Sequence, residues 1–281
     1  MPGTYRYVVA DVFTDVPLAG NQVAVFTDAR EIPEPQLQLL AREMAFSETV
    51  FVYAPSAGGH ARIRIFTPSA ELPFAGHPTL GTAFVLAMPM QLAEIRLETG
   101  VGIVAVELER EGARIVFGRM SQPVPTVEPF ARPDDLLRAL GVERSELPVE
   151  VYDNGVRHAY VALESPDAVA AVQPDFGALA QLELLGASCF AGSGTNWKTR
   201  MFAPGNGVPE DPATGSAAGP LACHVARHGL AAWGEEIVIE QGIELGRPSR
   251  LFARAEGADG LIDRVEVGGS AVVVARGEFA L

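Results

Sequence analysis

The chain contains one phrase twice. ELPFAGHPTLGTA begins at Glu71, and EDPATGSAAGPLA begins at Glu210. Each starts with Glu-x-Pro and reaches a glycine followed by a polar residue, so Gly76 aligns with Gly215 at an offset of 139 residues. Such self-similarity is the mark of an internal duplication, which restricts the chain to two similar halves.

A second match lies just upstream of each phrase. RIFTP begins at Arg64 and RMFAP begins at Arg200, an offset of 136 residues, so the second copy has three more residues between the two matching segments. Because both matches occur in the same order, coincidence is a poor explanation. We therefore predict that each half has the same succession of elements.

Hydrophobic patterns predict many strands and one buried helix in each half. GTAFVLAM is apolar on nearly all sides, which is typical of a buried helix. PQLQLLAREM predicts a second helix in the first half, with Leu37, Leu40, Ala41 and Met44 on one face. In the second half we expect a helical pair near 166–182 and a helix over GSAAGPLACHVARHG. The expected strands are YRYVVADVF, NQVAVF, ETVFVY, ARIRIF, AEIRLE, GIVAVELE, ARIVFG, VEVYD, RHAYVAL, WKTRMFA, EIVIEQ, LFARAE, VEVGG and AVVVARGEF.

A proline-rich segment separates the halves. SQPVPTVEPF has three prolines in ten residues and is predicted to be a linker. We therefore expect a first domain over residues 1–120 and a second over 121–281, with the last strand as a candidate to cross back to the first domain.

Composition restricts the class of function. The net charge is −14, and Lys198 is the only lysine among 21 basic residues, which argues against nucleic acid or an anionic membrane as a partner. The start of the chain lacks the pattern of a signal peptide, and its apolar runs are too short to cross a bilayer. Two cysteines, Cys189 and Cys223, are too few for a disulfide scaffold. We expect a cytoplasmic enzyme.

The repeated phrase has the form of a helix start. Backbone N–H groups at a helix N-terminus, together with the helix dipole, bind anions without any lysine. An acidic protein could hold an acidic substrate in this way. The alternative is simple capping, with Ser216 as the cap of the second helix.

The residues also resemble a known family. SETVFV, FTPSAELPFAGHPTLGTA and FAPGNGVPEDPATGSAAGPLACH are similar to the phenazine-biosynthesis isomerase (PhzF-like) family, and the resemblance covers essentially the whole chain. It implies an α+β protein with the diaminopimelate-epimerase-like fold. It further implies two pseudo-symmetric β-barrel-like halves, each wrapped around a central α-helix, with an active site between them, no cofactor, and a homodimer.

The resemblance assigns catalytic residues. Glu48 in SETVFV matches the general acid/base, and His77 and Asp211 match polar residues that orient or polarise the substrate. The residues themselves agree in part, because Glu48 emerges among apolar neighbours, where a carboxylate can act as a base. Moving a proton between carbons requires such a group within reach of both positions.

Substrate-binding residues also come from the resemblance. Gly76 and Gly215 match helix starts whose amides hold a carboxylate, and Ser216 matches a residue beside the substrate. Asn21 matches a Gly-Asn-Pro segment in which Gln22 replaces the proline here.

Related epimerases and racemases carry one cysteine in each phrase. The corresponding positions here are Ala75 and Thr214, which disfavours a two-thiol racemase. The offset of 136 takes Glu48 to Leu184, so the second half is expected to offer no matching carboxylate. A single base is better suited to moving a proton between two carbons, as an isomerase of this kind does, than to inverting the configuration of one carbon.

Other motifs support simpler interpretations. His224 and His228 stand four residues apart, but Val225 replaces the glutamate of the metalloprotease motif, and we expect a solvated helix face and no metal. His60 and His158 are expected in structural or surface roles. GSGTNW lacks the third glycine of a dinucleotide motif, which argues against a nucleotide cofactor. Glu71 and Glu210 are expected to stabilise the turn before each helix.

The sequence therefore predicts a cofactor-free isomerase that moves a proton between carbons of a small carboxylic acid. The substrate stays open between a dihydro-hydroxyanthranilate, an amino acid and another metabolite. The alternatives are an epimerase or racemase with carboxylate bases and a ligand-binding protein without turnover.

Overall fold

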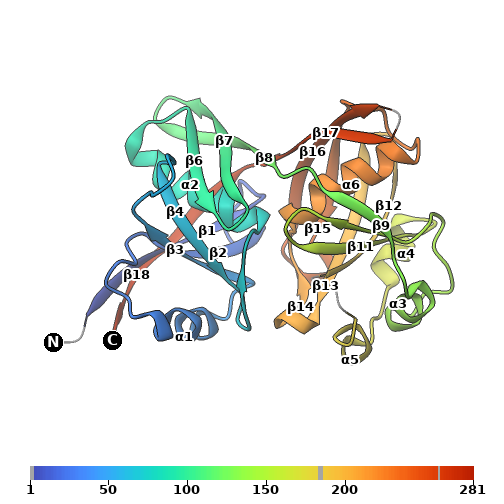
Figure 1. The fold of residues 1–281 in the computed structure, drawn as a ribbon, viewed down its shortest axis with the longest axis horizontal. Helices are drawn as coiled ribbons and strands as arrows, with labels where there is room; N and C mark the ends of the chain where they lie inside the picture. Colours follow the sequence, from blue (N-terminus) through green and yellow to red (C-terminus); the bar gives the residue numbers. More distant parts are fainter. Residues whose placement is uncertain (1–2, 183–185, 259) are drawn as a thin grey trace. The chain divides into compact units, whose positions relative to one another are not determined.

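The computed structural model describes residues 3–182, 186–258 and 260–281. The chain forms two compact units (Figure 1). Unit 1 comprises Met1–Ser121 with Gly268–Leu281, and unit 2 comprises Gln122–Val267. Unit 2 ends before the chain does, because the last strand, β18 (Ala271–Ala280), pairs along β1 (Thr4–Val12) of unit 1.

Unit 1 is a curled sheet around a helix. Its order of pairing is β18–β1–β2–β3–β4–β6–β7–β8, with β2–β3 and β4–β6 parallel and the other pairs antiparallel. The short β5 pairs with β4. Its other elements are β2 (Asn21–Phe26), α1 (Glu34–Met44), β3 (Glu48–Tyr53), β4 (Ala61–Phe66), β5 (Glu71–Leu72), α2 (Gly76–Met90), β6 (Glu94–Thr99), β7 (Gly102–Glu111) and β8 (Arg114–Gln122).

Helix α2 lies inside this sheet. It contacts β1, β2, β3, β6 and β18, and its first nine residues are all buried. The helix approaches β1 and β2 so closely that a Cβ on Gly81 would stand 2.7 Å from Val12 and Val23. The apolar sequence of α2 is explained by this burial, as predicted. The expected face of α1 is also confirmed, since Leu37, Leu40 and Ala41 are buried and Met44 packs beside them.

Unit 2 repeats the plan. Strands β9–β10–β11 are antiparallel, β11–β12 and β13–β15 are parallel, and β12–β13 and β15–β16 are antiparallel. Helix α6 is buried and contacts β15 and β16. The elements are β9 (Thr126–Pro129), α3 (Pro133–Leu140), β10 (Glu150–Asp153), β11 (Arg157–Ala162), α4 (Pro166–Ala171), α5 (Phe176–Leu179), β12 (Gly186–Ser193), β13 (Asn196–Ala203), η1 (Pro204–Asn206), β14 (Val208–Asp211), α6 (Gly215–Arg227), β15 (Glu236–Gln241), η2 (Ile243–Leu245), β16 (Ser249–Ala258) and β17 (Leu261–Gly269).

The segment expected to be a linker is largely strand. β8 continues to Gln122, and β9 pairs with β10, with Val127 opposite Tyr152. The boundary between the units does fall within SQPVPTVEPF, after Ser121, but the expectation that the segment is irregular was wrong. Its prolines lie between the two strands or at the end of β9, where a missing N–H is tolerated.

Matching ion pairs confirm the duplication. In unit 1, Arg64 binds Glu71 through two nitrogens at 2.6 and 2.7 Å. In unit 2, Arg200 binds Glu210 in the same way, with both distances at 2.8 Å. Each pair joins the strand before the phrase to the phrase itself. The expected structural role of Glu71 and Glu210 is therefore confirmed.

The strand registers extend the match beyond the phrases. Glu98 of β6 stands opposite Arg62 of β4, and Glu240 of β15 stands opposite Lys198 of β13. Arg62 and Lys198 are 136 residues apart, so β6 corresponds to β15 with an offset of 142. The offset varies along the chain because loop lengths differ between the two units.

Candidate active site

Three predicted residues meet in unit 1. Glu48 begins β3, His77 is the second residue of α2, and Asn21 begins β2. The Nε2 of His77 lies 3.3 Å from Glu48 Oε2, and its Nδ1 lies 3.1 Å from Asn21 Nδ2. The Glu48 side chain is 12% exposed, whereas that of His77 is 3% exposed. Glu48 is thus the member of the group that reaches solvent.

The partners of His77 define its protonation. Burial lowers the pKa of His77 to about 3, although a hydrogen bond to the Gln22 carbonyl opposes this shift, so the ring is neutral near pH 7. Nε2 lies 3.3 Å from the Gln22 carbonyl oxygen. Because a carbonyl oxygen can only accept a hydrogen bond, Nε2 carries the hydrogen. Nδ1 then accepts from the Asn21 amide. The Nε2 hydrogen is thus given to the Gln22 carbonyl, and the neutral ring contacts the Glu48 carboxylate at 3.3 Å.

The start of α2 has the form expected of an anion site. Ala75 is the N-cap residue, and the first turn, Gly76–Thr79, contains no acidic side chain. Thr79 N–H bonds the Ala75 carbonyl, and Pro78 has no N–H. The amides of Gly76 and His77 are thus the first-turn donors that face away from the helix.

In unit 2, Asp211 is held by the start of the next helix. Asp211 ends β14 and is 4% exposed. Thr214, the N-cap residue of α6, donates its hydroxyl to Asp211 Oδ2 at 2.6 Å. This contact uses the Thr214 hydroxyl, so the side chain does not cap the helix.

Ser216 faces the interior of unit 2. It is 3% exposed, and its Oγ lies 3.1 Å from Nε2 of His158, which is fully buried on β11. Burial lowers the pKa of His158 to about 3, so this imidazole is also neutral. The alternative in which Ser216 caps α6 was wrong, because Thr214 is the N-cap and the Ser216 hydroxyl contacts His158 instead. The expected structural role of His158 fits this contact.

The first turns of α6 are fixed by side chains from other elements. Pro220 lacks the N–H that would bond the Ser216 carbonyl, and Asn154 Nδ2 donates to that carbonyl at 2.9 Å. Gln122 Nε2 donates to the Gly215 carbonyl at 2.8 Å. These bonds hold the start of α6 in place.

The registers place Gly186 at the position of Glu48. Glu48 begins β3 opposite Val23 of the parallel strand β2, and Gly186 begins β12 opposite His158 of the parallel strand β11. Leu184, which the offset of 136 had indicated, lies outside the described residues. Glycine itself offers no side chain, and a Cβ at this position would require Met201 to move. Unit 2 therefore has no carboxylate at the position that corresponds to Glu48.

Helix α6 also carries the two histidines that suggested zinc. His224 Nδ1 and His228 Nε2 lie 3.2 and 3.1 Å from Glu150 Oε2, which Arg227 also binds at 3.0 Å. His224 is fully buried, so the expectation of a solvated face was wrong for it. Burial raises the pKa of Glu150, but the hydrogen bonds from both histidines and the charge of Arg227 outweigh this effect and lower it to about 2. A guanidinium on the same oxygen makes this cluster an ion-pair network rather than a cation site. Sequence reasoning missed Glu150, because no local motif links it to α6.

Both thiols are interior. Cys189 and Cys223 are free and buried, and burial raises the pKa of each to about 12. Ala75 and Thr214, the positions at which related racemases carry cysteine, are the N-cap residues of α2 and α6. The structure thus places no described thiol at either helix start.

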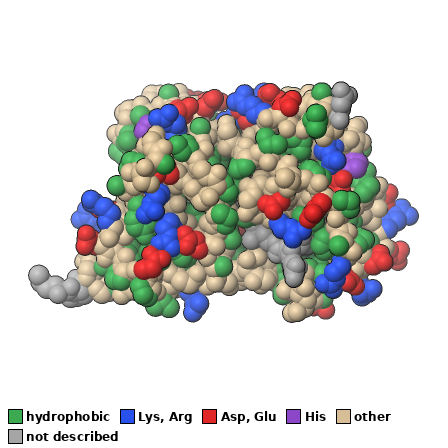
Figure 2. Space-filling view, in the orientation of Figure 1, with side chains coloured by type: hydrophobic (Ala, Val, Ile, Leu, Met, Phe, Trp, Pro, Cys, Tyr) green, Lys and Arg blue, Asp and Glu red, His purple; other side chains and the backbone are tan. Residues whose placement is uncertain are grey.

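The surface and helices limit the alternatives. Figure 2 shows acidic and basic side chains intermixed on the face that it draws. Within the described ranges, no helix is both long and apolar enough to span a membrane.

Solved structures define the fold class. The PhzF-family phenazine biosynthesis protein of Bacillus anthracis superposes with a TM-score of 0.85 at 25% identity, covering 99% of this chain and 100% of that one. A hydroxyproline epimerase from Agrobacterium vitis superposes with a TM-score of 0.69 at 11% identity, covering 100% of this chain and 94% of that one. The fold is therefore the diaminopimelate-epimerase-like α+β fold, with two pseudo-symmetric barrel-like halves that each surround a helix.

Sequence comparison identifies the family. The model of the phenazine biosynthesis-like protein family matches residues 10–277. A trans-2,3-dihydro-3-hydroxyanthranilate isomerase of Pseudomonas aeruginosa is 52% identical over 277 residues, covering 99% of this chain and 100% of that protein. The chain belongs to the phenazine biosynthesis-like family, and it is an isomerase.

Proposed function

We propose that the protein isomerises trans-2,3-dihydro-3-hydroxyanthranilate, and that Glu48 moves the proton. The observation that carries this proposal is the 3.3 Å contact between Glu48 and the neutral ring of His77 in unit 1. The full-length identity of 52% to an isomerase named for that substrate supports the choice of substrate.

The proton balance is simple. The carboxylate of Glu48 removes a proton from one carbon of the substrate, and the resulting carboxylic acid returns it to another carbon of the same molecule. His77, being nearly fully buried and neutral, orients Glu48 by contact and does not transfer a proton itself. Asn21 in turn fixes the ring of His77. In this assignment His77 and Asn21 are positioning residues, and Asp211 orients the substrate.

Substrate binding is proposed at the helix starts. The amides of Gly76 and His77, and those of Gly215 and Ser216, are suited to a carboxylate because a helix N-terminus attracts anions. Crystals soaked in sulfate should show density beside one of these amide pairs. Density found only at other positions would contradict this binding mode.

The decisive test is Glu48→Gln, which keeps the shape of the side chain but removes the base. In D₂O, the wild type should incorporate deuterium at carbon to the extent that the proton on the partly exposed Glu48 exchanges with solvent before it is returned. The variant should lose about 10⁴-fold in kcat, the upper range for general acid–base catalysis. Glu71→Gln is the matched control, since it alters a carboxylate of the repeated phrase that is bound to Arg64, and it should keep most of the activity.

Three results would contradict the proposal. One is a Glu48→Gln enzyme with near-normal kcat. Another is a wild type that does not turn over this substrate. The third is inversion at one carbon without a shift of the double bonds, which would favour an epimerase. Because Gly186 stands where unit 2 would need a second carboxylate, we favour the isomerase over a two-carboxylate epimerase.

We also propose a cytoplasmic homodimer. Two buried, free thiols are compatible with a reducing compartment. The family resemblance supports the dimer. Size-exclusion chromatography with light scattering should give twice the mass of one chain, and a monomer would reject this assignment.

A further inference from the structure

We propose that Gln241, at the end of β15, is a positioning residue that holds Asp211 in its working orientation. This inference rests on the proposed function, because it assumes that Asp211 orients the substrate. Sequence reasoning gave Gln241 no role. In the fold, it lies buried beside the turn between β14 and α6.

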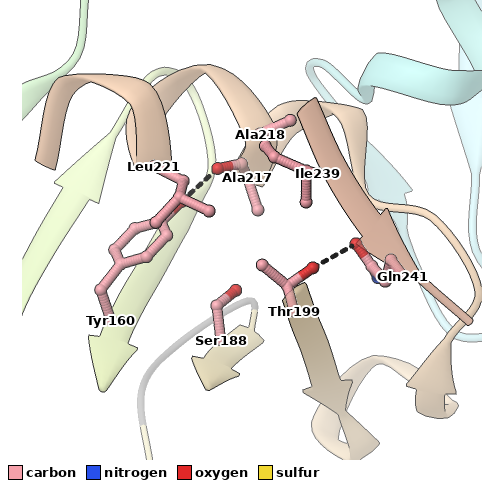
Figure 3. Close-up of a pocket in the computed structure, with 8 residues that line it drawn as sticks. All are labelled: Tyr160, Ser188, Thr199, Ala217, Ala218, Leu221, Ile239 and Gln241. Atoms are coloured by element: carbon pink, nitrogen blue, oxygen red, sulfur yellow. Dashed lines mark hydrogen bonds between the residues drawn. The ribbon is translucent and has the colours of Figure 1, made fainter. Parts of the chain in front are cut away.

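The amide of Gln241 uses all of its hydrogen-bonding capacity. Nε2 donates to the Asp211 carbonyl at 2.8 Å and to Thr214 Oγ1 at 2.9 Å. Oε1 accepts from the Thr214 N–H and from Thr199 Oγ1, both at 3.2 Å. Figure 3 shows Thr199 and Gln241 reaching toward each other from adjacent strands. A buried amide with four partners is rigid, since any rotation leaves a polar group unsatisfied.

The direction of these bonds is determined by the partners. A backbone N–H can only donate, so the group facing Thr214 N must be Oε1 of Gln241. Nε2 therefore faces Thr214 Oγ1, which accepts from it. The one hydrogen of the Thr214 hydroxyl then goes to the carboxylate of Asp211, at 2.6 Å. Gln241 thus acts on Asp211 through Thr214, and also directly through the Asp211 carbonyl.

Unit 1 lacks this network at the matching positions. The registers of β6 and β15 align Thr99 with Gln241, since Thr99 follows Glu98 as Gln241 follows Glu240. The unit 1 counterparts of Asp211, Thr214 and Gln241 are Leu72, Ala75 and Thr99. Thr99 donates its hydroxyl to the Gly102 carbonyl of the next hairpin instead. The same backbone plan therefore forms in unit 1 without this polar group, which is present in the unit that carries Asp211.

The test compares two buried residues of the same strand pair. Gln241→Met keeps the length of the side chain and removes all four bonds. Ser249→Ala is the control, because Ser249 is buried opposite Gln241 and its hydroxyl donates to the Arg247 carbonyl. We expect Gln241→Met to lose about 10–100-fold in kcat, the scale of a small misplacement of a reacting group, while Ser249→Ala keeps wild-type kcat.

A double-variant cycle separates positioning from a general structural effect. If Gln241 acts through Asp211, Gln241→Met should add little to the loss in kcat of Asp211→Asn. Additive losses, or near-normal kcat in Gln241→Met, would overturn the proposal. Glu48→Gln distinguishes the two failures, because the proposed function stands if that variant is inactive while Gln241→Met is normal.

Crystal structures of the wild type and of Gln241→Met test, without any substrate, whether Gln241 positions Asp211. In Gln241→Met we expect the Asp211 carboxylate to leave the position in which it accepts from Thr214. If the 2.6 Å contact and the orientation of Asp211 are kept, Gln241 is not a positioning residue, whatever the wild-type enzyme turns over.

Discussion

The Nε2 of His77 lies 3.3 Å from Oε2 of Glu48, and the Nδ1 of the same ring accepts a hydrogen bond from Asn21. The ring is buried and neutral. The three side chains come from β2, β3 and α2, so the fold assembles the group. A neutral imidazole restrains the carboxylate by contact without placing a positive charge beside it. This arrangement leaves Glu48 able to act as a base while its orientation is fixed.

Two buried neutral histidines should make folding sensitive to mild acid. Burial lowers the pKa of His77 and of His158 from 6.5 to about 3. Below pH 6.5 these two histidines are protonated in the unfolded chain but stay neutral in the folded chain. Their contribution to the free energy of unfolding is therefore complete above pH 6.5 and decreases as the pH is lowered toward 3. Between pH 6.5 and 5 each histidine should cost roughly 1.5 kcal/mol.

Urea unfolding at several pH values in that window measures the effect. In His158→Gln, the free energy of unfolding should change less with pH, because the unfolded chain takes up about one proton fewer. This variant should nevertheless be less stable than the wild type at pH 7. The carboxylates with lowered pKa lose their contribution at lower pH, because Glu150 titrates near 2 when folded. A wild type whose free energy of unfolding is flat between pH 5 and 6.5 would show that these rings are not kept neutral.

The duplication and the two helix starts could be predicted from the sequence because they depend on local repetition. Matching segments fold alike, and Gly76 and Gly215 do begin α2 and α6. The site assignments within unit 1 came from the family resemblance. Their mutual contacts are consistent with it, but their roles in catalysis stay predictions.

Contacts between distant segments could not be predicted in this way. The offset of 136 holds for Arg64 and Arg200 but becomes 138 from Glu48 to Gly186, because loop lengths differ between the halves. Strand register, and not the sequence offset, decides which side chains correspond. The same reason hid Gln241, whose partners lie 27 to 42 residues away and share no local pattern with it.

The two matching ion pairs should differ in their contribution to stability. The side chains of Arg200 and Glu210 are each 9% exposed, whereas Glu71, the partner of Arg64, is 42% exposed. Arg200→Met would leave a buried, unpaired carboxylate, which costs about 3–5 kcal/mol. Arg64→Met should cost at most about 1 kcal/mol, since water solvates Glu71.

Chemical denaturation of both variants gives the comparison. Replacing Glu210 by Gln in the Arg200→Met background should recover part of the loss, because the uncompensated charge is removed. Equal costs for Arg200→Met and Arg64→Met would show that burial does not separate the two pairs.

The thiols should be inert in the folded protein. Burial raises the pKa of Cys189 and Cys223 to about 12, so almost no thiolate forms at pH 8. Ellman's reagent should therefore react slowly with the native protein and with two thiols after denaturation. Cys189→Ala and Cys223→Ala should retain turnover. Loss of activity in either, with the protein still folded, would support a thiol mechanism.

Gly242 should tolerate substitution far less than Gly246, although both have positive φ. Their φ values are 77° and 67°, so an alanine at either position costs about 1 kcal/mol in backbone strain. A Cβ on Gly242 would also overlap the Arg247 carbonyl and stand 2.5 Å from that of Pro212, whereas a Cβ on Gly246 meets no described atom within 4 Å. Crowding against backbone adds about 1–3 kcal/mol, so Gly242→Ala should cost roughly 2–4 kcal/mol in unfolding free energy.

Gly242→Ala should also lower kcat, because Pro212 follows Asp211 and Gly242 follows Gln241, whereas Gly246→Ala should not. Urea unfolding and steady-state kinetics on both variants test this, and equal losses would mean that the contact with Pro212 does not hold the turn.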